Sequence, residues 1–231
     1  RCLRGRNASR WLLIPPSHSG LQFCNDDFCV ALRIRLGIPM RTDYPQHCSC
    51  KAAADIVEFP FHHLVCDTLK RLSITSRHDS ILQAIITTAT LAGADVRKFP
   101  RYAVPSGARP EPDARISWAD TSYIVDVSVT CPMMDSLADH ASRVDGICLV
   151  NRANAKKHDY VAAAQASHAE FIPLIFDSFG GCTDGVRRLL GELAALAEHN
   201  GIDSRHRFLN GAWNAVSVAL QVGNVRILRE G

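Results

Sequence analysis

A regular succession of helical and strand-like hydrophobic patterns runs from Ser76 to Gly201. Apolar residues recur first at helical spacing, three short strand-like segments follow, and a helix, a strand and a second clear helix complete the series. The segments lie, in that order, at residues 76–93, 96–104, 112–118, 122–129, 152–166, 170–179 and 183–199. This order predicts an α/β domain with a mixed sheet flanked by helices.

Less regular sequence lies on both sides of this region. A helix is predicted over 25–36, and Gly37 is expected to end it. Residues 37–61 are rich in proline, cysteine and polar side chains, which indicates a loop-rich segment without a core of its own. A last amphipathic helix is predicted over 208–220, where it would cover the core.

The bulk composition is typical of a globular protein and weakly basic. Hydrophobic residues make up 47% of the 231 residues, and the formal net charge is +3, which permits a nucleic-acid partner without demanding one. No stretch reaches the roughly 18 apolar residues that a membrane-spanning helix needs. The nine cysteines are odd in number and their spacing does not indicate a disulfide framework. We therefore expect an intracellular protein with no membrane partner.

Two carboxylates stand out on neighbouring predicted strands. Asp113 begins one strand and Asp126 interrupts the apolar run of the next. If the strands form a hairpin that turns at 119–120, the two positions face each other with Cβ atoms about 5 Å apart. Such a pair can share one hard cation such as Mg²⁺. The alternative is that Asp126 lies on the solvated face of an edge strand and Asp113 in a turn.

A cation is expected to accompany these acids, because phosphodiester cleavage builds negative charge at the scissile phosphate. The position two residues after the second acid is Ser128, so a lysine must come from elsewhere. Lys156 and Tyr160 lie four residues apart on one face of the next predicted helix. The alternative is a solvated pair, Lys156 and Lys157, on a surface helix.

From about Trp11 onward the chain resembles the region downstream of the reverse transcriptase in non-LTR retrotransposons with a restriction-like, PD-(D/E)XK-type endonuclease. Landmarks occur in the order typical of that family, and together they cover nearly the whole chain. They are Ala31-Leu32-Arg33 to Leu36-Gly37, Cys48-x-Cys50, His62-His63-Leu64-Val65-Cys66, Arg77-His78-Asp79, Pro112-Asp113, Val125 to Val129, Lys156 with Tyr160, Phe171 to Leu174 leading to Gly180-Gly181, and Gln221 to Arg229.

The resemblance implies an αβββαβ restriction-endonuclease-like core. It further implies that Asp113 and Asp126 are Mg²⁺ ligands, that Lys156 is the catalytic lysine and that Tyr160 is an accessory residue. The chain departs from the family pattern in the long gap between Asp126 and Lys156, where residues 133–150 look like an insertion. Lys157 therefore remains an alternative for the catalytic role.

A second group of chemically active residues lies in the loop-rich segment. Cys48, Cys50, His62 and Cys66 form a C-x-C-x11-H-x3-C pattern, and three thiolates with one imidazole are a standard tetrahedral Zn²⁺ ligand set. His63 is an alternative to His62. His78 is a further candidate, either as a ligand or as a contact to DNA. If zinc is absent, these residues are unrelated buried thiols. The family carries a similar Cys-Cys-His-Cys knuckle before its nuclease, thought to help grip nucleic acid.

These patterns divide the chain into three parts. They are a helical and zinc-knuckle-like segment at 1–75, a restriction-like endonuclease core at 76–201 and a C-terminal helical extension at 202–231.

The function that the resemblance implies is that of a Mg²⁺-dependent DNA endonuclease. It would nick target DNA and leave the 3′ hydroxyl that primes reverse transcription, in the nucleus. Its partners would be the DNA target, the element RNA and the reverse transcriptase portion of the same polyprotein.

The first alternative is a catalytically decayed zinc-containing module of a mobile element that binds nucleic acid without cutting it. A set of basic residues could form its footprint: Arg33, Arg35, Arg41, Lys70, Arg71, Arg77, Arg97, Lys98 and Arg101. A structural zinc protein without a nucleic-acid role is a third possibility.

Overall fold

A four-stranded mixed sheet lies at the centre of the protein. The computed structural model describes residues 7–15, 19–40, 46–50, 53–57, 59–66, 68, 74–99 and 112–230. The strands are β1 (Asp95–Lys98), β2 (Ala114–Trp118), β3 (Thr121–Thr130) and β4 (Glu170–Asp177), in the spatial order β1-β2-β3-β4. β1, β2 and β3 pair antiparallel, whereas β4 runs parallel to β3. A parallel pair needs a crossover connection, which the helical segment between β3 and β4 provides.

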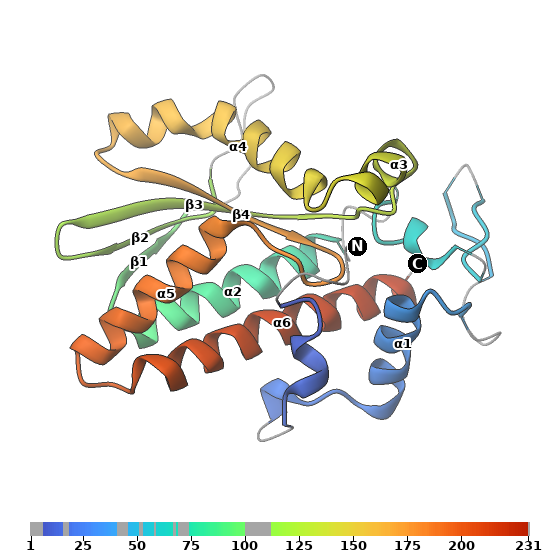
Figure 1. The fold of residues 1–231 in the computed structure, drawn as a ribbon, viewed down its shortest axis with the longest axis horizontal. Coiled ribbons are helices and arrows are strands. Elements are labelled where there is room, and N and C mark those ends of the chain that lie inside the picture. The colour runs from blue at the N-terminus through green and yellow to red at the C-terminus, as the bar shows by residue number, and fades with distance from the viewer. Residues whose placement is uncertain are drawn as a thin grey trace.

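Helices cover both faces of this sheet (Figure 1). On one side lie α2 (Thr75–Leu91), α5 (Asp184–His199) and α6 (Arg205–Glu230), and on the other lies α4 (Ile147–Ala166), preceded by α3 (Asp135–Arg143). The predicted order of helix, three strands, helix and strand is present as α2-β1-β2-β3-α4-β4, with α3 added before α4. The protein is thus a mixed α/β domain with a sheet flanked by helices.

The alternation of side chains along β3 decides which residues meet which helices. Val125 and Val127 point into the main core, where they join Ile81 and Ile85 of α2 and Leu189 of α5. Each fully buried side chain of this size contributes about 1.5–3 kcal/mol to folding. Because successive side chains of a strand point to opposite faces, Ile124, Asp126 and Ser128 point toward α4.

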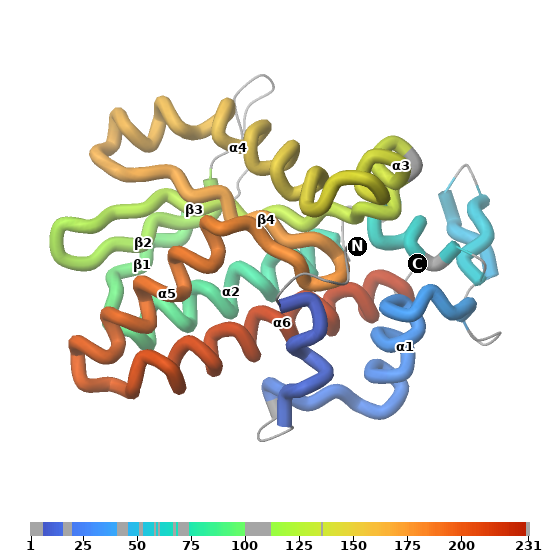
Figure 2. The backbone as a smooth tube through the Cα atoms, in the orientation of Figure 1, coloured from blue at the N-terminus to red at the C-terminus, as the bar shows by residue number. Residues whose placement is uncertain are grey.

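α6 joins this core to the N-terminal part of the chain. Trp213 and Leu220 pack in the main core, whereas Val225 and Leu228 pack in a second apolar cluster with Ile34 of α1. α1 spans Asn25–Leu36 and ends at Gly37, as expected, with the left-handed backbone (φ 64°) that glycine adopts without strain. Figure 2 shows the blue segment near the N-terminus lying against the red helix α6, which contacts the short 3-10 turn Arg10–Leu13.

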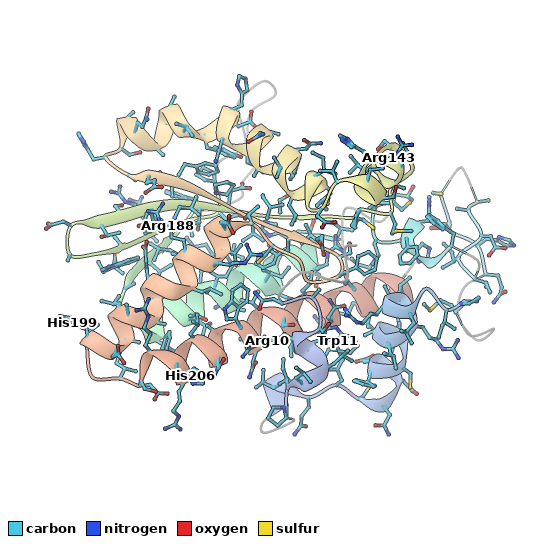
Figure 3. All side chains as sticks on the ribbon, in the orientation of Figure 1. Arg10, Trp11, Arg143, Arg188, His199 and His206 are labelled. Carbon is cyan, nitrogen blue, oxygen red and sulfur yellow. The ribbon has the colours of Figure 1, made fainter. Side chains whose placement is uncertain are left out.

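Arg10 fixes that contact between the N-terminal segment and α6. Figure 3 shows Arg10 next to α6. Its Nε donates a hydrogen bond to Oδ1 of Asn214 at 3.0 Å, and its Nη2 donates to Oδ1 of Asn210 at 2.9 Å. Trp11 beside it is buried. α6 therefore contributes to both apolar clusters, and the three-part division of the chain stays a prediction.

Several sequence expectations are corrected at element boundaries. Residues 133–150 contain α3 and the first turn of α4, and their being an insertion relative to the family pattern stays a prediction. The last helix is not confined to 208–220, because its apolar residues continue to Leu228 and pack against α1. The strand expected over 96–104 is present as Asp95–Lys98, and residues 100–111 lie outside the described residues. Among the described helices none is both long enough and apolar enough to span a membrane.

Candidate functional site

One face of α4 runs antiparallel to the polar face of β3, and three pairs of residues meet between them. Arg152 Nε donates to Ser128 Oγ at 2.8 Å, and Lys156 Nζ lies 2.8 Å from Asp126 Oδ2. Tyr160 packs with Ile124. The pairing is regular because four helix residues rise about 6 Å while two strand residues span about 6.8 Å. The helix therefore places a positively charged side chain next to each of the two polar residues, Asp126 and Ser128.

Asp126 is the buried charge at the centre of this row. It is 4% exposed, and its Oδ2 makes no hydrogen bond of good geometry within the described residues, although the Lys156 ammonium is close. Burial raises the pKa of this carboxyl, Lys156 acts in the opposite direction, and the neighbouring charge of Asp113 raises it further. A carboxylate in this position is short of stabilising partners, so an added cation would be favourable there.

Asp113 lies immediately before β2, next to the pair Ala114–Val125. If this register continues by one residue, Asp113 lies opposite Asp126. The influence of the Asp113 charge on the pKa of Asp126 agrees with such a short separation. Oδ2 of Asp113 accepts hydrogen bonds from the backbone N–H of Val127 at 2.6 Å and from the His78 ring. The two predicted acids, both buried, are thus close enough for the charge of one to influence the other.

His78 contacts Asp113 from the first turn of α2. Its Nε2 lies 3.0 Å from Oδ2 of Asp113, and its Nδ1 lies 3.1 Å from Oδ1 of Asp79. The suggestion that His78 is a zinc ligand is therefore wrong, because its ring is held between two carboxylates instead. The sequence contained no signal for this contact, which depends on how α2 docks against the start of β2.

The structure separates the two candidate lysines. The Lys156 side chain is 15% exposed and reaches Asp126, whereas Lys157 is exposed and lines a hollow between α4, β4 and the start of α5. Tyr160 is buried one turn beyond Lys156, whose ammonium lies 5.4 Å from the centre of its ring. Burial and the nearby Asp126 charge raise the pKa of Tyr160 to about 12, so its hydroxyl keeps its proton at neutral pH.

Sequence reasoning missed Arg152. Its position four residues before Lys156 was the available signal, since residues at this spacing share a helix face. It could be recognised only once the register of α4 against β3 was known.

The donor set around the acids fits a divalent cation of the Mg²⁺ kind. Mg²⁺ is commonly bound through one or two protein carboxylates, with water and substrate phosphate completing its shell. Asp113 and Asp126 supply two such carboxylates. Within the described residues no third carboxylate, histidine or cysteine joins them in a compact ligand group.

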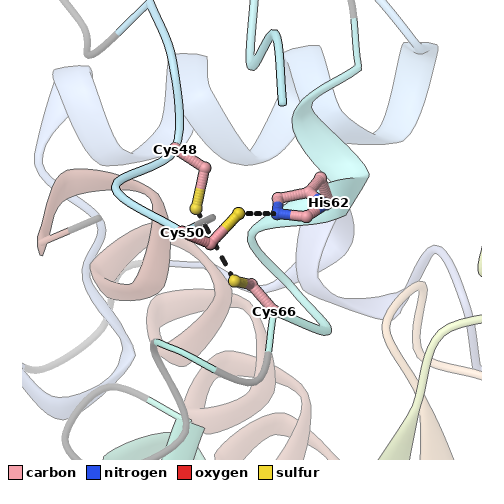
Figure 4. Close-up of side chains that lie close together, drawn as sticks. All are labelled: Cys48, Cys50, His62 and Cys66. Carbon is pink, nitrogen blue, oxygen red and sulfur yellow. Dashed lines mark hydrogen bonds between the residues drawn. The ribbon is translucent and has the colours of Figure 1, made fainter. Parts of the chain in front are cut away.

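The second site is a compact group of three cysteines and one histidine (Figure 4). Sγ of Cys48 lies 3.6 Å from Sγ of Cys66, and Sγ of Cys50 lies 3.3 Å from Nε2 of His62. All four donor atoms lie within 4.8 Å of one another. A tetrahedral Zn²⁺ with bonds of about 2.3 Å to sulfur places its ligands about 3.8 Å apart, so the donors are close to the required spacing.

The acid–base state of the cluster also suits a metal site. Burial raises the pKa of Cys48 to about 12, the backbone hydrogen bond from Cys50 opposes this, and the side-chain contacts with Cys66 and Cys50 raise the pKa further, so without metal this group is a neutral thiol. Zn²⁺ binding would release its proton. His63 is not part of the cluster. Its ring is fully buried and has no hydrogen-bond partner among the described residues, and burial lowers its pKa to about 4. His62 is therefore the histidine that belongs to the group.

Arg77 connects the Cys/His cluster to the acid site. Its Nη2 donates to the backbone carbonyl of Leu64 at 3.3 Å, two residues before Cys66, and its Nη1 donates to Oδ1 of Asn224 at 2.9 Å. Burial lowers the pKa of this guanidinium to about 10. Arg77 directly precedes His78, which contacts Asp113. The start of α2 therefore contacts both the acid site and the backbone next to the Cys/His cluster.

The expected basic footprint is only partly on the surface. Arg77 is buried, and the guanidinium groups of Arg33 and Arg35 donate to backbone carbonyls of the chain itself. Arg97 and Lys98 are exposed on β1. The other expected members, Arg41, Lys70, Arg71 and Arg101, lie outside the described residues.

Comparison with known proteins adds no family assignment. No family model matches the chain, and a search of curated proteins gives no significant match.

Proposed function

We propose that this protein is a Mg²⁺-dependent endonuclease that nicks DNA, with the αβββαβ core of the restriction-like enzymes of non-LTR retrotransposons. One observation carries the proposal. Two buried acids, Asp113 at the start of β2 and Asp126 in β3, influence each other electrostatically, and Lys156 of α4 lies against Asp126. Buried titratable groups whose pKa is shifted by desolvation and by a neighbouring charge are concentrated at functional sites, and paired carboxylates are the ligands that a hard divalent cation prefers.

The two acids would hold the cation. When bound, Mg²⁺ supplies positive charge to a phosphate oxygen and lowers the pKa of coordinated water. Asp126 has an oxygen without a well-formed hydrogen bond, and Asp113 is fixed by the N–H of Val127 and by His78. These two contacts would keep the Asp113 carboxylate in one orientation. The Asp126 carboxylate would bind the cation in place of the Lys156 ammonium.

Lys156 would stabilise the negative charge that develops on the phosphate during cleavage. Its ammonium lies against Asp126 and over the Tyr160 ring, so its position is set by two contacts. In the reaction a water oxygen bonds to phosphorus and the bond from phosphorus to the 3′ oxygen breaks. The 3′ oxygen takes up a proton, and the products are a 5′ phosphate and a 3′ hydroxyl that can prime reverse transcription.

The Cys/His cluster would hold a structural Zn²⁺ and support contacts to nucleic acid. By the same resemblance, the partners are the DNA target, the element RNA and the reverse transcriptase portion of a common polyprotein, and the site of action is the nucleus.

A nicking assay on supercoiled plasmid with Mg²⁺ tests the proposal. Asp126→Asn is expected to abolish conversion to open circles, while the exposed Asp139→Asn on α3 should nick like the unaltered protein. Equal nicking by the protein and Asp126→Asn would contradict the proposal.

One observation favours the second candidate, a module that binds DNA without cutting it. The ammonium of Lys156 lies 2.8 Å from Oδ2 of Asp126, and this ion pair alone would also account for a buried acid at this position. DNA binding without nicking by the unaltered protein would support this candidate.

A further inference from the structure

We propose that Arg152 forms a second phosphate-binding position in the candidate nuclease site and holds the DNA backbone next to the scissile phosphate. The proposal rests on the endonuclease function proposed above. Arg152 lies one helical turn before Lys156 on the same face of α4, and its Nε donates to Ser128 Oγ at 2.8 Å.

The charge of Arg152 is not neutralised by the protein. Other arginines near α4 and α5 pair with carboxylates, as Arg188 does with Glu170 and Arg143 with Asp139. Within the described residues Arg152 forms no ion pair, and its two Nη groups donate no hydrogen bond. A guanidinium held only by a neutral hydroxyl keeps a planar pair of donors for an anion, and phosphate oxygens match that geometry.

The spacing of the two cations matches a DNA strand. Residues one turn apart on a helix are separated by about 6 Å along its axis. The phosphates of a duplex strand wind around the axis, so neighbouring phosphates lie farther apart than their axial rise of about 3.4 Å, at roughly 6–7 Å, which is close to the spacing of Arg152 and Lys156. If Lys156 acts at the scissile phosphate, Arg152 contacts a neighbouring phosphate of the same strand.

Ser128 orients this arginine. Ser128 lies two residues after Asp126 on the same face of β3. Its side chain carries no charge, and its hydroxyl accepts a hydrogen bond from the Arg152 guanidinium of α4. Its hydroxyl fixes the Nε edge of Arg152 and thereby directs the opposite edge away from the strand. Ser128 is thus a positioning residue for Arg152. Loss of its hydroxyl should leave the Arg152 guanidinium less well oriented and its charge unchanged.

The experiment measures binding of a fluorescent DNA duplex to the zinc-loaded full chain without Mg²⁺, across a range of KCl concentrations. Loss of one phosphate contact lowers the slope of log K against log salt by about 0.9, which corresponds to roughly eightfold weaker binding at 0.1 M salt. Arg152→Gln is expected to show both changes. Arg143→Gln, which removes an exposed arginine with an acidic partner, serves as the matched control and should change neither.

Ser128→Ala adds a second readout. It is expected to keep the salt slope of the unaltered protein, because the charge remains, while Mg²⁺-dependent nicking slows several-fold. An unchanged slope and affinity for Arg152→Gln would overturn the proposal. If Arg152→Gln lowers the slope but Asp126→Asn nicks normally, the phosphate position stands and the proposed metal chemistry fails. Absence of DNA binding by the unaltered protein would overturn both.

Discussion

Nε2 of His78 lies 3.0 Å from Oδ2 of Asp113, and this contact joins the first turn of α2 to the start of β2. The same oxygen accepts the N–H of Val127, so Asp113 is held by two donors from two elements. Outer partners of this kind orient a metal-binding carboxylate before the metal arrives.

His78→Ala should therefore weaken cation binding without removing a ligand. We expect the Mg²⁺ concentration for half-maximal nicking to rise about 10- to 100-fold, as is usual when an outer partner of a metal ligand is lost. His78→Gln can restore one donor and should recover part of the loss. His140→Ala on α3 is the control. A Mg²⁺ dependence identical to that of the unaltered protein would show that His78 has no positioning role.

The two lysines of α4 should differ sharply. Lys156→Ala should slow nicking about 100- to 1,000-fold, the usual effect of removing a group that stabilises transition-state charge. Lys157→Ala should stay within about twofold, because loss of an exposed side chain outside the site removes no such interaction. Single-turnover nicking at saturating Mg²⁺ measures both variants. The reverse order of effects would move the catalytic role to Lys157.

The raised pKa of Asp126 predicts a specific dependence of stability on pH. A carboxyl whose pKa is higher in the folded than in the unfolded state stabilises the fold below its unfolded pKa. That contribution disappears as pH rises through the folded pKa, and burial is the main cause here. Asp126→Asn, which is neutral at all pH values, should lack this loss. In the absence of Mg²⁺ it should gain stability relative to the unaltered protein between acidic and neutral pH.

Urea unfolding at several pH values, with both proteins measured side by side, tests that prediction. A difference between the two proteins that is independent of pH would contradict the raised pKa. A difference of the opposite sign would show that the Lys156 charge outweighs burial.

The helical and strand order could be predicted from the sequence because apolar periodicity records which faces are buried. The pairing of Asp113 with Asp126 also followed, since their equal distance from the turn at 119–120 fixes the hairpin register. His78 and Arg152 could not be found in this way. Their contacts depend on how α2 and α4 pack against the sheet, which local pattern does not encode.

The Cys/His cluster could be predicted from the residue types and their spacing. Cysteines and a histidine close together in a segment that lacks an apolar core are typical of a zinc site. The choice between His62 and His63 needed the structure. Both follow the same short turn, and only the direction of each ring decides which one faces the sulfurs.

Zinc content provides the next prediction. We expect one Zn²⁺ per chain, and loss of that ion from Cys66→Ser. Cys131→Ser replaces a buried cysteine of the same apolar cluster outside the four ligands and should keep the metal. Because binding of a structural zinc ion contributes to the folding of the residues that hold it, removal of zinc should expose the chain around Cys48 and Cys66 to proteases first. Zinc analysis with limited proteolysis measures both effects, and full zinc content in Cys66→Ser would contradict the assignment.

The close approach of α2 and α6 can be tested by a pair of glycine substitutions. A Cβ at Gly223 would lie 2.5 Å from Cγ and 3.0 Å from the backbone Cα of Arg77. Gly223→Ala should destabilise the fold by about 1–3 kcal/mol, as overpacking usually does. Gly211 on the same helix meets nothing within 4 Å, so Gly211→Ala should stabilise by about 0.5–1 kcal/mol through helix propensity. Denaturant unfolding compares the two, and equal effects would contradict the packing described.

The proposed endonuclease chemistry requires one divalent cation shared by Asp113 and Asp126. Anomalous diffraction from crystals grown with Mn²⁺ in place of Mg²⁺ tests this most directly. We expect a single manganese peak bonded to carboxylate oxygens of both residues, with Lys156 displaced from Asp126 toward the open side of the site. Crystals with the metal elsewhere, or with no peak between the two acids, would contradict the proposed endonuclease.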